Sequence, residues 1–481
     1  MPNVPNAAEL AFASWLAETE KDRQRNVALA REYYEGDHDT FLTDRLREFL
    51  NAKKDHEFNL NVVRQVVDVV AERLIVLEMG TSEDKPAGGS RTPLQQWIDG
   101  VWKSADLDVL QSDVHEGTGR DGEFFIVVDW NAEAGRPNLT PHPRYVDPTV
   151  GGDGFGCKAH YPNDDTRQPM QYASKRWIEQ LDNSKTRSRM NLYYPGRVEK
   201  YEWNGGAWIP FRDDNDSAWP LPWVRADGSP RGIPVVHFRN TFDLRPESWD
   251  AIPLQRAINK ALIDLMATGD MTAFRIFTSF GFQPTSDGQP LKADGSNAAR
   301  LGPAQIIGSN KSPSEAAFNA IDGADVTPVI GLLEALIGWL AVVTSTPKSR
   351  LTFGRQVAAE GTLQEMNEGL FAKCRKRQLL LDRSWVKCFE MARILANDFG
   401  GESLDEAIAF VPVWEAIQSR DTYTRQAEWK AKRDLGVPLV QIWSEMGYTS
   451  EQITTMQQSE EYQSYIAMLR LNMTMQQPAA G

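Results

Sequence analysis

The sequence predicts a mainly α-helical fold with a smaller α+β region, in a subunit that assembles with other copies. Apolar residues recur every three or four positions along residues 360–398, which is the spacing of one helix face. Residues 326–344 are apolar except for Glu334, so this helix needs neighbours on most sides. Pro, Gly, Asn and aromatic residues dominate residues 120–240, where short strands are expected.

Helical patterns fill most of the first 115 residues. Ala7–Tyr34, Asp44–Leu50 and Thr92–Val114 each carry apolar residues at helical spacing. Asn59–Leu77 carries a wide apolar stripe that also predicts a helix. Its many β-branched residues lower helix propensity, so a strand is the competing assignment there.

The region that follows carries three strand signals. Glu123–Trp130 predicts a buried strand, and Gly232–Phe238 predicts another. Between them, Tyr201–Trp208 predicts a hairpin, because Asn204-Gly205 supplies the positive φ angles of a tight turn.

The second half of the chain returns to helices. Pro253–Phe277 and Val326–Thr344 are predicted helices, and residues 281–325, rich in Gly, Pro, Asn, Asp and Ser, predict a small separate lobe between them. A long amphipathic helix runs from about Glu360 to Asp398, and Gly400-Gly401 closes it. We expect shorter helices after it, and these contain Trp414, Trp429 and Trp443.

Composition limits the class of protein. The 481 residues carry a net charge of −14, so tight non-specific binding of nucleic acid by the whole surface is not expected, although a passage through which DNA slides is compatible. Cys157, Cys374 and Cys388 are too few and too far apart for a disulfide framework or a zinc site, which fits a reducing cytoplasm. No signal peptide is predicted.

Three short motifs resemble known signatures but lack their context. Gly117–Gly122 reads G-x-G-x-x-G, yet it lies after a predicted helix and before a strand, the reverse of a dinucleotide site. In Gly308–Ser312 two residues separate the glycine from the lysine, which is not the spacing of a phosphate loop. Ser345–Lys348 has Ser-x-x-Lys spacing without the partner motifs of acylating enzymes.

No catalytic residue, metal site or cofactor is predicted. The six histidines are isolated and the carboxylates are scattered. Because folding can gather scattered carboxylates around a metal ion, a metal-dependent DNA-processing enzyme stays open as an alternative.

The apolar segment 326–344 has two explanations. Its length is near the minimum for a membrane span, but Glu334 lies in its middle, where a charge costs about 2.5–3.5 kcal/mol. Burial by neighbouring subunits explains the same composition and is favoured, with Gly331, Gly338 and Trp339 as packing positions. A virion structural or membrane-docked protein anchored by 326–344 is the alternative.

Basic residues gather in two places. Lys348, Arg350 and Arg355 lie in a loop between two long helices, where they can contact a polyanion without binding it tightly. A second group lies on the long helix, and for it a solvated surface is the preferred interpretation. Its members are Lys373, Arg375, Lys376 and Arg377.

An ordered set of motifs extends over about residues 30–460. Its members are Tyr33–Gly36, Asn59–Leu74, Trp102 with Leu107-Asp108, Gly119–Trp130, Gly232–Asn240, Leu254–Asp264 and Thr346-Pro347. In this order the set resembles the portal proteins of tailed double-stranded-DNA phages, in the broad group found in siphophages. No single motif is specific; the order carries the resemblance.

The resemblance implies a homo-oligomeric ring, usually of twelve subunits, at one capsid vertex, made in the bacterial cytoplasm and built into the virion. Its implied partners are double-stranded DNA, the terminase large subunit, the head-tail adaptor, the major capsid protein and scaffolding protein, with no membrane. The implied parts are a wing (1–249), a first stem helix (250–280), a clip (281–325), a second stem helix (326–346), a tunnel loop (347–359), a long wing helix (360–401) and a crown (402–481).

The tunnel loop and the stem carry the residues that the resemblance marks as functional. The loop residues expected at DNA are Lys348, Ser349, Arg350, Leu351, Thr352, Phe353 and Arg355, and those expected in stem packing are Gly331, Glu334, Gly338 and Trp339. Many relatives carry a Ser-Gly pair after the loop, whereas this chain reads Val357-Ala-Ala-Glu-Gly361-Thr362. The end of the loop is therefore fixed only to within several residues.

Overall fold

The structure is a computed structural model. It describes residues 6–37, 60–83, 91–147, 155–182, 185–213, 216–273, 276–281, 317–321, 325–351, 360–417, 422–446, 450–459, 462–464 and 466–468, with single positions elsewhere. The chain divides into two compact units. Unit 1 comprises Met1–Asp37, Val62–Ile252 and Ala341–Gly481, and unit 2 comprises His38–Asn61 and Pro253–Leu340.

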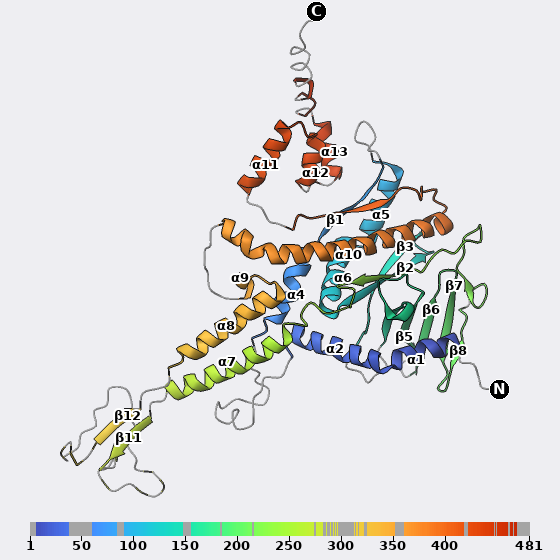
Figure 1. The fold of residues 1–481 in the computed structure, drawn as a ribbon. Helices are drawn as coiled ribbons and strands as arrows, with labels where there is room; N and C mark the ends of the chain where they lie inside the picture. Colours follow the sequence, from blue (N-terminus) through green and yellow to red (C-terminus); the bar gives the residue numbers. More distant parts are fainter. Residues whose placement is uncertain are drawn as a thin grey trace, which may run out of the picture. The chain divides into compact units, whose positions relative to one another are not determined.

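Unit 1 combines helices with several antiparallel sheets (Figure 1). Its described helices are α1 (Ala7–Leu16), α2 (Glu18–Glu35), α4 (Val63–Ala71), α5 (Pro93–Ser104), α6 (Leu107–Asp121), the short η1 (Pro162–Asp164), α9 (Lys348–Leu351), α10 (Glu360–Gly400), α11 (Thr422–Asp434), α12 (Leu439–Glu445) and α13 (Ser450–Gln458). Its described strands are β1 (Val76–Thr81), β2 (Glu123–Asn131), β3 (Arg136–Pro143), β4 (Gly156–His160), β5 (Tyr172–Asp182), β6 (Lys185–Tyr193), β7 (Arg197–Trp203), β8 (Trp208–Pro210), β9 (Leu221–Pro222), β10 (Val235–Arg239) and β13 (Phe410–Trp414).

Two predicted helices are each divided. The prediction of one helix over Ala7–Tyr34 is wrong, because Ala17 has an extended backbone (φ −60°, ψ 146°) between α1 and α2. Thr92–Val114 is likewise divided at Asp106, whose left-handed backbone (φ 46°) separates α5 from α6. In both cases the apolar spacing continues across the break, so periodicity alone hides it.

The stretch Asn59–Leu77 contains both predicted types of element. Val63–Ala71 is helical, as expected, and its valines are buried. The β-branched residues after it belong to a strand, since β1 begins at Val76. The predicted helix Asp44–Leu50 lies outside the described residues.

The three strand signals are confirmed. β2 lies between β10 and β3 in an antiparallel sheet, in the order β10-β2-β3. β7 and β8 pair across the predicted Asn204-Gly205 turn, with Trp203 opposite Trp208. The larger sheet has the order β4-β5-β6-β7-β8, and β9 also pairs with β7.

Trp414 lies in a strand, and the expectation that it is helical is wrong. β13 pairs with β1, where Trp414 is opposite Val76. The two strands are more than 300 residues apart, so only the folded chain reveals the pairing. The following helices α11, α12 and α13 agree with the expected helical end of the chain.

The G-x-G-x-x-G motif is a turn between a helix and a strand. α6 ends at Asp121, Gly122 takes φ +89°, and β2 begins at Glu123. A Cβ atom at Gly122 would lie 2.2 Å from the Leu244 oxygen, so close backbone approach explains the glycine. The motif does not lie at the N-terminus of a helix, as a pyrophosphate site requires.

The main apolar core of unit 1 lies between one face of the β10-β2-β3 sheet and four helices, one of which is α4, with Val69 and Val70. Phe124, Ile126 and Phe238 of the sheet pack with residues of α5, α6 and α10. Trp385 is the largest buried residue contributed by α10, and its ring meets Phe238 edge-on at 5.1 Å. Figure 1 shows α10 crossing unit 1 above α4 and α6.

A second feature of unit 1 is a buried network of charges. Arg144, only 4% exposed, contacts Glu20 at 2.8 Å and Glu123 at 3.1 Å. Lys158 Nζ lies 2.8 Å from Glu20 Oε2, and His237 Nε2 lies 2.9 Å from Glu123 Oε2. Burial alone would raise the pKa of Glu20, but Arg144 and Lys158 lower it to about 2. Residues more than 100 positions apart are thereby held together.

Unit 2 contains a helix, a β-hairpin and most of a second helix. α7 (Ile252–Ala273) leads into β11 (Ile276–Phe280), while β12 (Ala317–Ile321) leads into α8 (Thr327–Thr344). Because β11 and β12 pair antiparallel, the end of α7 and the start of α8 are brought together. The predicted helices at Pro253–Phe277 and Val326–Thr344 are confirmed, apart from the last residues of the first, which are strand. Most of residues 281–325 lie outside the described residues.

Candidate functional site

The candidate site is the turn that leaves α8 and enters the basic segment. Ser345 takes a left-handed backbone (φ +54°), and Thr346 N donates to Ala341 O at 2.9 Å. Thr346 and Pro347 are buried. The helix therefore ends in a fixed turn, and the short helix α9 follows at once.

Helix α9 exposes its polar residues and buries one apolar residue. Lys348, Ser349 and Arg350 are exposed, whereas Leu351 is only 4% exposed. Leu351 is thus buried in the single chain, and its contact with DNA stays a prediction. Thr352, Phe353 and Arg355 lie outside the described residues, so their placement stays a prediction.

Arg350 has neighbours that the sequence did not indicate. Its Nη2 atom lies 3.5 Å from Glu72 Oε2, with both side chains about half exposed. A contact of this length and exposure stabilises the chain by less than about 1 kcal/mol. Burial lowers the pKa of Arg73, and the charge of Arg350 lowers it further, so two cations lie close together at the end of α4.

The basic group on α10 is only partly a solvated surface, which corrects the expectation. Arg375 and Lys376 are exposed as expected. Lys373 and Arg377 are each 15% exposed and bind the same buried carboxylate, Glu247, at 2.5 and 2.8 Å. Lys373 and Arg377 are four residues apart on one helix face, so both can reach the same carboxylate. Because Glu247 is far away in the sequence, the periodicity of the helix does not reveal this partner.

Lys373 also fixes the end of α8. Its ammonium donates to Thr344 O at 2.7 Å, one of the carbonyls that a helix C-terminus leaves without a partner. Burial and the Arg377 guanidinium lower the pKa of Lys373, whereas the contact with Glu247 favours its charged form. The turn that carries α9 is thus bound directly to α10.

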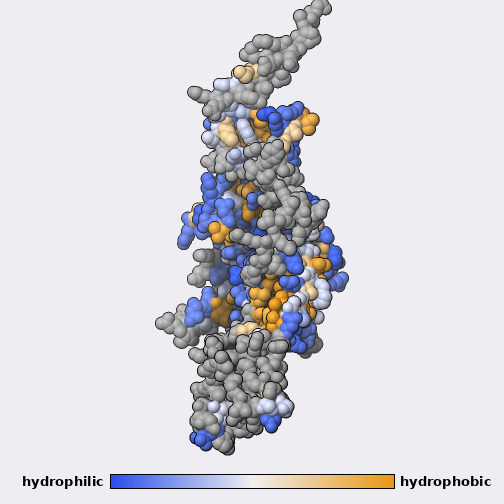
Figure 2. Space-filling view, turned by 90° about the vertical axis from the view of Figure 1, so that its left-hand side faces the viewer, coloured by the Kyte–Doolittle hydropathy of each residue, from blue (hydrophilic) through white to orange (hydrophobic). Residues whose placement is uncertain are grey.

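Helix α8 leaves apolar side chains uncovered. Trp339 is 56% exposed and Val342 is 78% exposed, and Ile330, Leu332 and Val343 are exposed as well. Glu334 and Gly331 are also exposed, and a Cβ atom at Gly331 or Gly338 would meet no described atom within 4 Å. Figure 2 shows apolar residues gathered on one face of the molecule. By length and composition α8 is the one described helix able to cross a membrane, with 28% of it buried.

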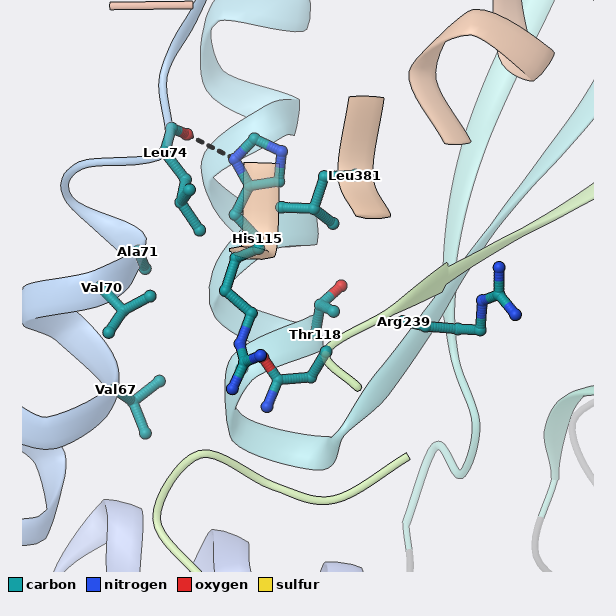
Figure 3. Close-up of a pocket in the computed structure, with 11 residues that line it drawn as sticks. Val67, Val70, Ala71, Leu74, His115, Thr118, Arg239 and Leu381 are labelled. Atoms are coloured by element: carbon teal, nitrogen blue, oxygen red, sulfur yellow. Dashed lines mark hydrogen bonds between the residues drawn. The ribbon is translucent and has the colours of Figure 1, made fainter. Parts of the chain in front are cut away.

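A small cavity beside α4, α6 and α10 offers no room for a substrate. Its volume is about 10 Å³, close to the space of one water molecule. His115, which lines it, donates from Nδ1 to Leu74 O at 2.6 Å, as Figure 3 shows, and accepts from Trp385 Nε1 at 2.9 Å. Burial lowers the pKa of His115 to about 4, so the imidazole is neutral and structural. Among the described residues, no group of three His, Cys, Asp or Glu could hold a metal ion.

Comparison with known proteins gives a family for this arrangement. The model of the family described as phage portal protein, SPP1 Gp6-like, matches residues 14–414 of the 481. No curated protein matches the chain. The match extends from α1 through both helices of the α7–α8 pair to the last residue of β13, and so includes the basic turn after α8. The chain belongs to the SPP1 Gp6-like family of phage portal proteins.

Proposed function

We propose that the chain is the subunit of a ring, usually of twelve copies, through which double-stranded DNA enters and leaves the capsid. As a phage portal protein it is a structural component of the capsid vertex in a family that packages DNA and joins the head to the tail. The observation that carries the ring is the uncovered apolar face of α8, since Trp339 and Val342 are more exposed than a soluble monomer favours.

Neighbouring copies would cover this face. Residues 250–280 and 326–346 would then be the stem, with Gly331 and Gly338 allowing close approach. Residues 281–325 would form the clip that meets the terminase large subunit and later the head-tail adaptor. Residues 1–249 and 360–401 would form the wing, and 402–481 the crown, within reach of the major capsid and scaffolding proteins.

The exposed end of α9 would face passing DNA. Lys348 and Arg350 carry positive charge on an acidic chain, and Arg350 is only weakly held by Glu72. A few exposed charges would guide DNA without the barrier that many phosphate contacts would impose. No catalytic role is proposed for these residues.

The experiment for the ring is direct. Mass photometry and negative-stain imaging of the purified chain at micromolar concentration should show one large ring with a central channel and no added ligand. Monomers alone under these conditions would contradict the proposal.

The second candidate is a membrane-docked virion protein anchored by residues 326–344, which the length and hydropathy of α8 favour. Fractionation distinguishes the two. Recovery of the chain with membranes, lost on deletion of residues 326–344, would support the anchor, while rings in the soluble fraction would support the portal.

A further inference from the structure

A groove in unit 1 lies between β10, one face of α10 and the loop after β4. Its volume is about 610 Å³, within the range of about 300–1,000 Å³ typical of binding pockets. Ile233, Val235 and Met391 give it an apolar part. The groove is therefore large enough for a few side chains of a partner.

Three cations in this groove have no carboxylate partner. Among the described residues, no ion pair reaches Arg239, Arg383 or Lys387, although two other lining cations are paired, Arg231 with Asp398 at 2.6 Å and Arg167 with Asp165 at 3.6 Å. Arg239, Arg383 and Lys387 line the same groove, and partial desolvation together with the two guanidinium charges lowers the pKa of Lys387. One lining carboxylate, Glu390, opposes them only in part.

The mixed lining favours a protein segment over DNA. Ile233 is only partly buried beside the buried Val235 and Met391, and it gives the groove an apolar part that a phosphate backbone would not use. A partner segment that fits this groove would carry an exposed apolar residue flanked by carboxylates. The apolar residue would meet the apolar part of the groove, and the carboxylates would pair with the cations. Such complementarity is what selects a partner and fixes its register.

The chain itself carries a surface of this kind on α6. Val109 is 67% exposed, the exposed Asp106 lies immediately before the first residue of α6, and the exposed Asp113 lies four residues after Val109 on the same helix face. Among the described residues neither carboxylate forms an ion pair with a cation. This surface, Asp106, Val109 and Asp113, shares no residue with the groove, so a contact between them would be heterologous, as closure into a ring requires.

We propose that the cationic groove of one copy receives the α6 surface of the next copy. Arg239, Arg383 and Lys387 would meet Asp106 and Asp113, and Val109 would lie against Ile233 and Met391. This inference rests on the proposed ring and adds an electrostatic contact between wings to the apolar contact along α8.

A charge swap tests it. The groove variant is Arg383→Glu with Lys387→Glu, and the α6 variant is Ser112→Lys with Asp113→Lys; all four positions are exposed on helices. Each variant alone should raise the concentration at which half of the chains form rings, measured by mass photometry, by roughly tenfold or more, because like charges meet. The two together should restore most of the loss.

The matched control is Arg375→Glu with Lys376→Glu, which makes the same charge change on exposed α10 residues outside the groove. It should leave ring formation unchanged. If all variants form rings as the wild type does, this inference is wrong while the ring stands; if the wild type forms no ring, the proposed function itself is wrong. A labelled duplex retained by wild-type rings and lost by groove-variant rings that still assemble would assign the groove to DNA and overturn the proposal. Circular dichroism separates loss of assembly from loss of folding.

Discussion

The buried interior of unit 1 and the exposed face of helix α8, whose last four residues also belong to unit 1, differ in the side chains that they cover. Unit 1 buries charged residues and gives them partners within the same chain, as Arg144 does with Glu20 and Glu123. Helix α8 leaves Trp339 and Val342 uncovered, although burying a large apolar side chain is worth about 1.5–3 kcal/mol. The buried charges of unit 1 thus have partners within the chain, whereas the exposed face of α8 would gain stability from the neighbouring copies of the proposed ring.

Acid should have the largest effect on this contrast, because it destabilises unit 1 by protonating its buried groups. Burial lowers the pKa of His115 and of His237 to about 4, below the 6.5 of an exposed imidazole. Between pH 4 and pH 6.5 the two imidazoles bind protons in the unfolded chain but not in the folded chain. The free energy of unfolding is therefore largest above pH 6.5 and decreases as the pH falls toward 4. Each imidazole contributes on the order of 3 kcal/mol.

The measurement is the denaturant midpoint of tryptophan fluorescence at pH 7.5, 5.5 and 4.5. His115→Gln keeps a donor for Leu74 O and an acceptor for Trp385 Nε1 but cannot titrate, so this variant should lose stability less steeply with acid. A midpoint that does not change between pH 7.5 and 4.5 would contradict the assignment of neutral buried imidazoles.

Removing the centre of the charge network should have the next largest effect. Arg144→Met leaves Glu20 and Glu123 buried without their main partner, and breaking a buried pair in this way costs about 3–5 kcal/mol. Arg25→Met is the control, since Arg25 is 69% exposed and its ion pairs should contribute less than about 1 kcal/mol. Equal losses of unfolding free energy in the two variants would show that burial does not determine how much these charges contribute to stability.

Trp339→Ala tests the other half of the contrast, the exposed apolar face of α8. Because Trp339 is 56% exposed in the single chain, the free energy of unfolding of a dilute monomer should change by less than about 0.5 kcal/mol. Assembly should weaken by about 2 kcal/mol if neighbours bury the ring. Sedimentation velocity over a concentration series measures the second quantity, and Leu379→Ala, which shortens another exposed apolar residue, on α10, is the control. Unchanged assembly would remove Trp339 from the stem contact.

The smallest structural effect is expected at α9. Lys348→Ala with Arg350→Ala removes two exposed charges and the weak contact to Glu72, so stability should change by less than about 1 kcal/mol and rings should form normally. The change should appear in DNA packaging or retention, measured as the fraction of heads that keep a full genome. Loss of the rings would instead make these residues structural.

Local patterns predicted most individual elements. The periodicity of residues 360–398 indicated α10, and Asn204-Gly205 indicated the turn between β7 and β8. The breaks at Ala17 and Asp106 were missed, since each depends on a backbone angle that no apolar spacing encodes.

Non-local pairings account for the rest. Trp414 was expected in a helix because the partner strand β1 is far away in the sequence. Lys373 and Arg377 were interpreted as a solvated surface because their carboxylate, Glu247, comes from another part of the chain. At the candidate site the basic turn was predicted, but the burial of Leu351 and the presence of Glu72 and Arg73 beside Arg350 depend on the packing of α4 against α9.

The contact between Lys373 and the last carbonyl of α8 has a mechanical consequence. In the proposed ring, DNA that moves past α9 would pull repeatedly on residues 345–351. Since Thr344 O is bound by Lys373, and Lys373 and Arg377 are both bound to Glu247, such a pull is carried into the 41-residue helix α10. Strain at the turn would thus be shared between α8 and α10, the longest helix among the described residues.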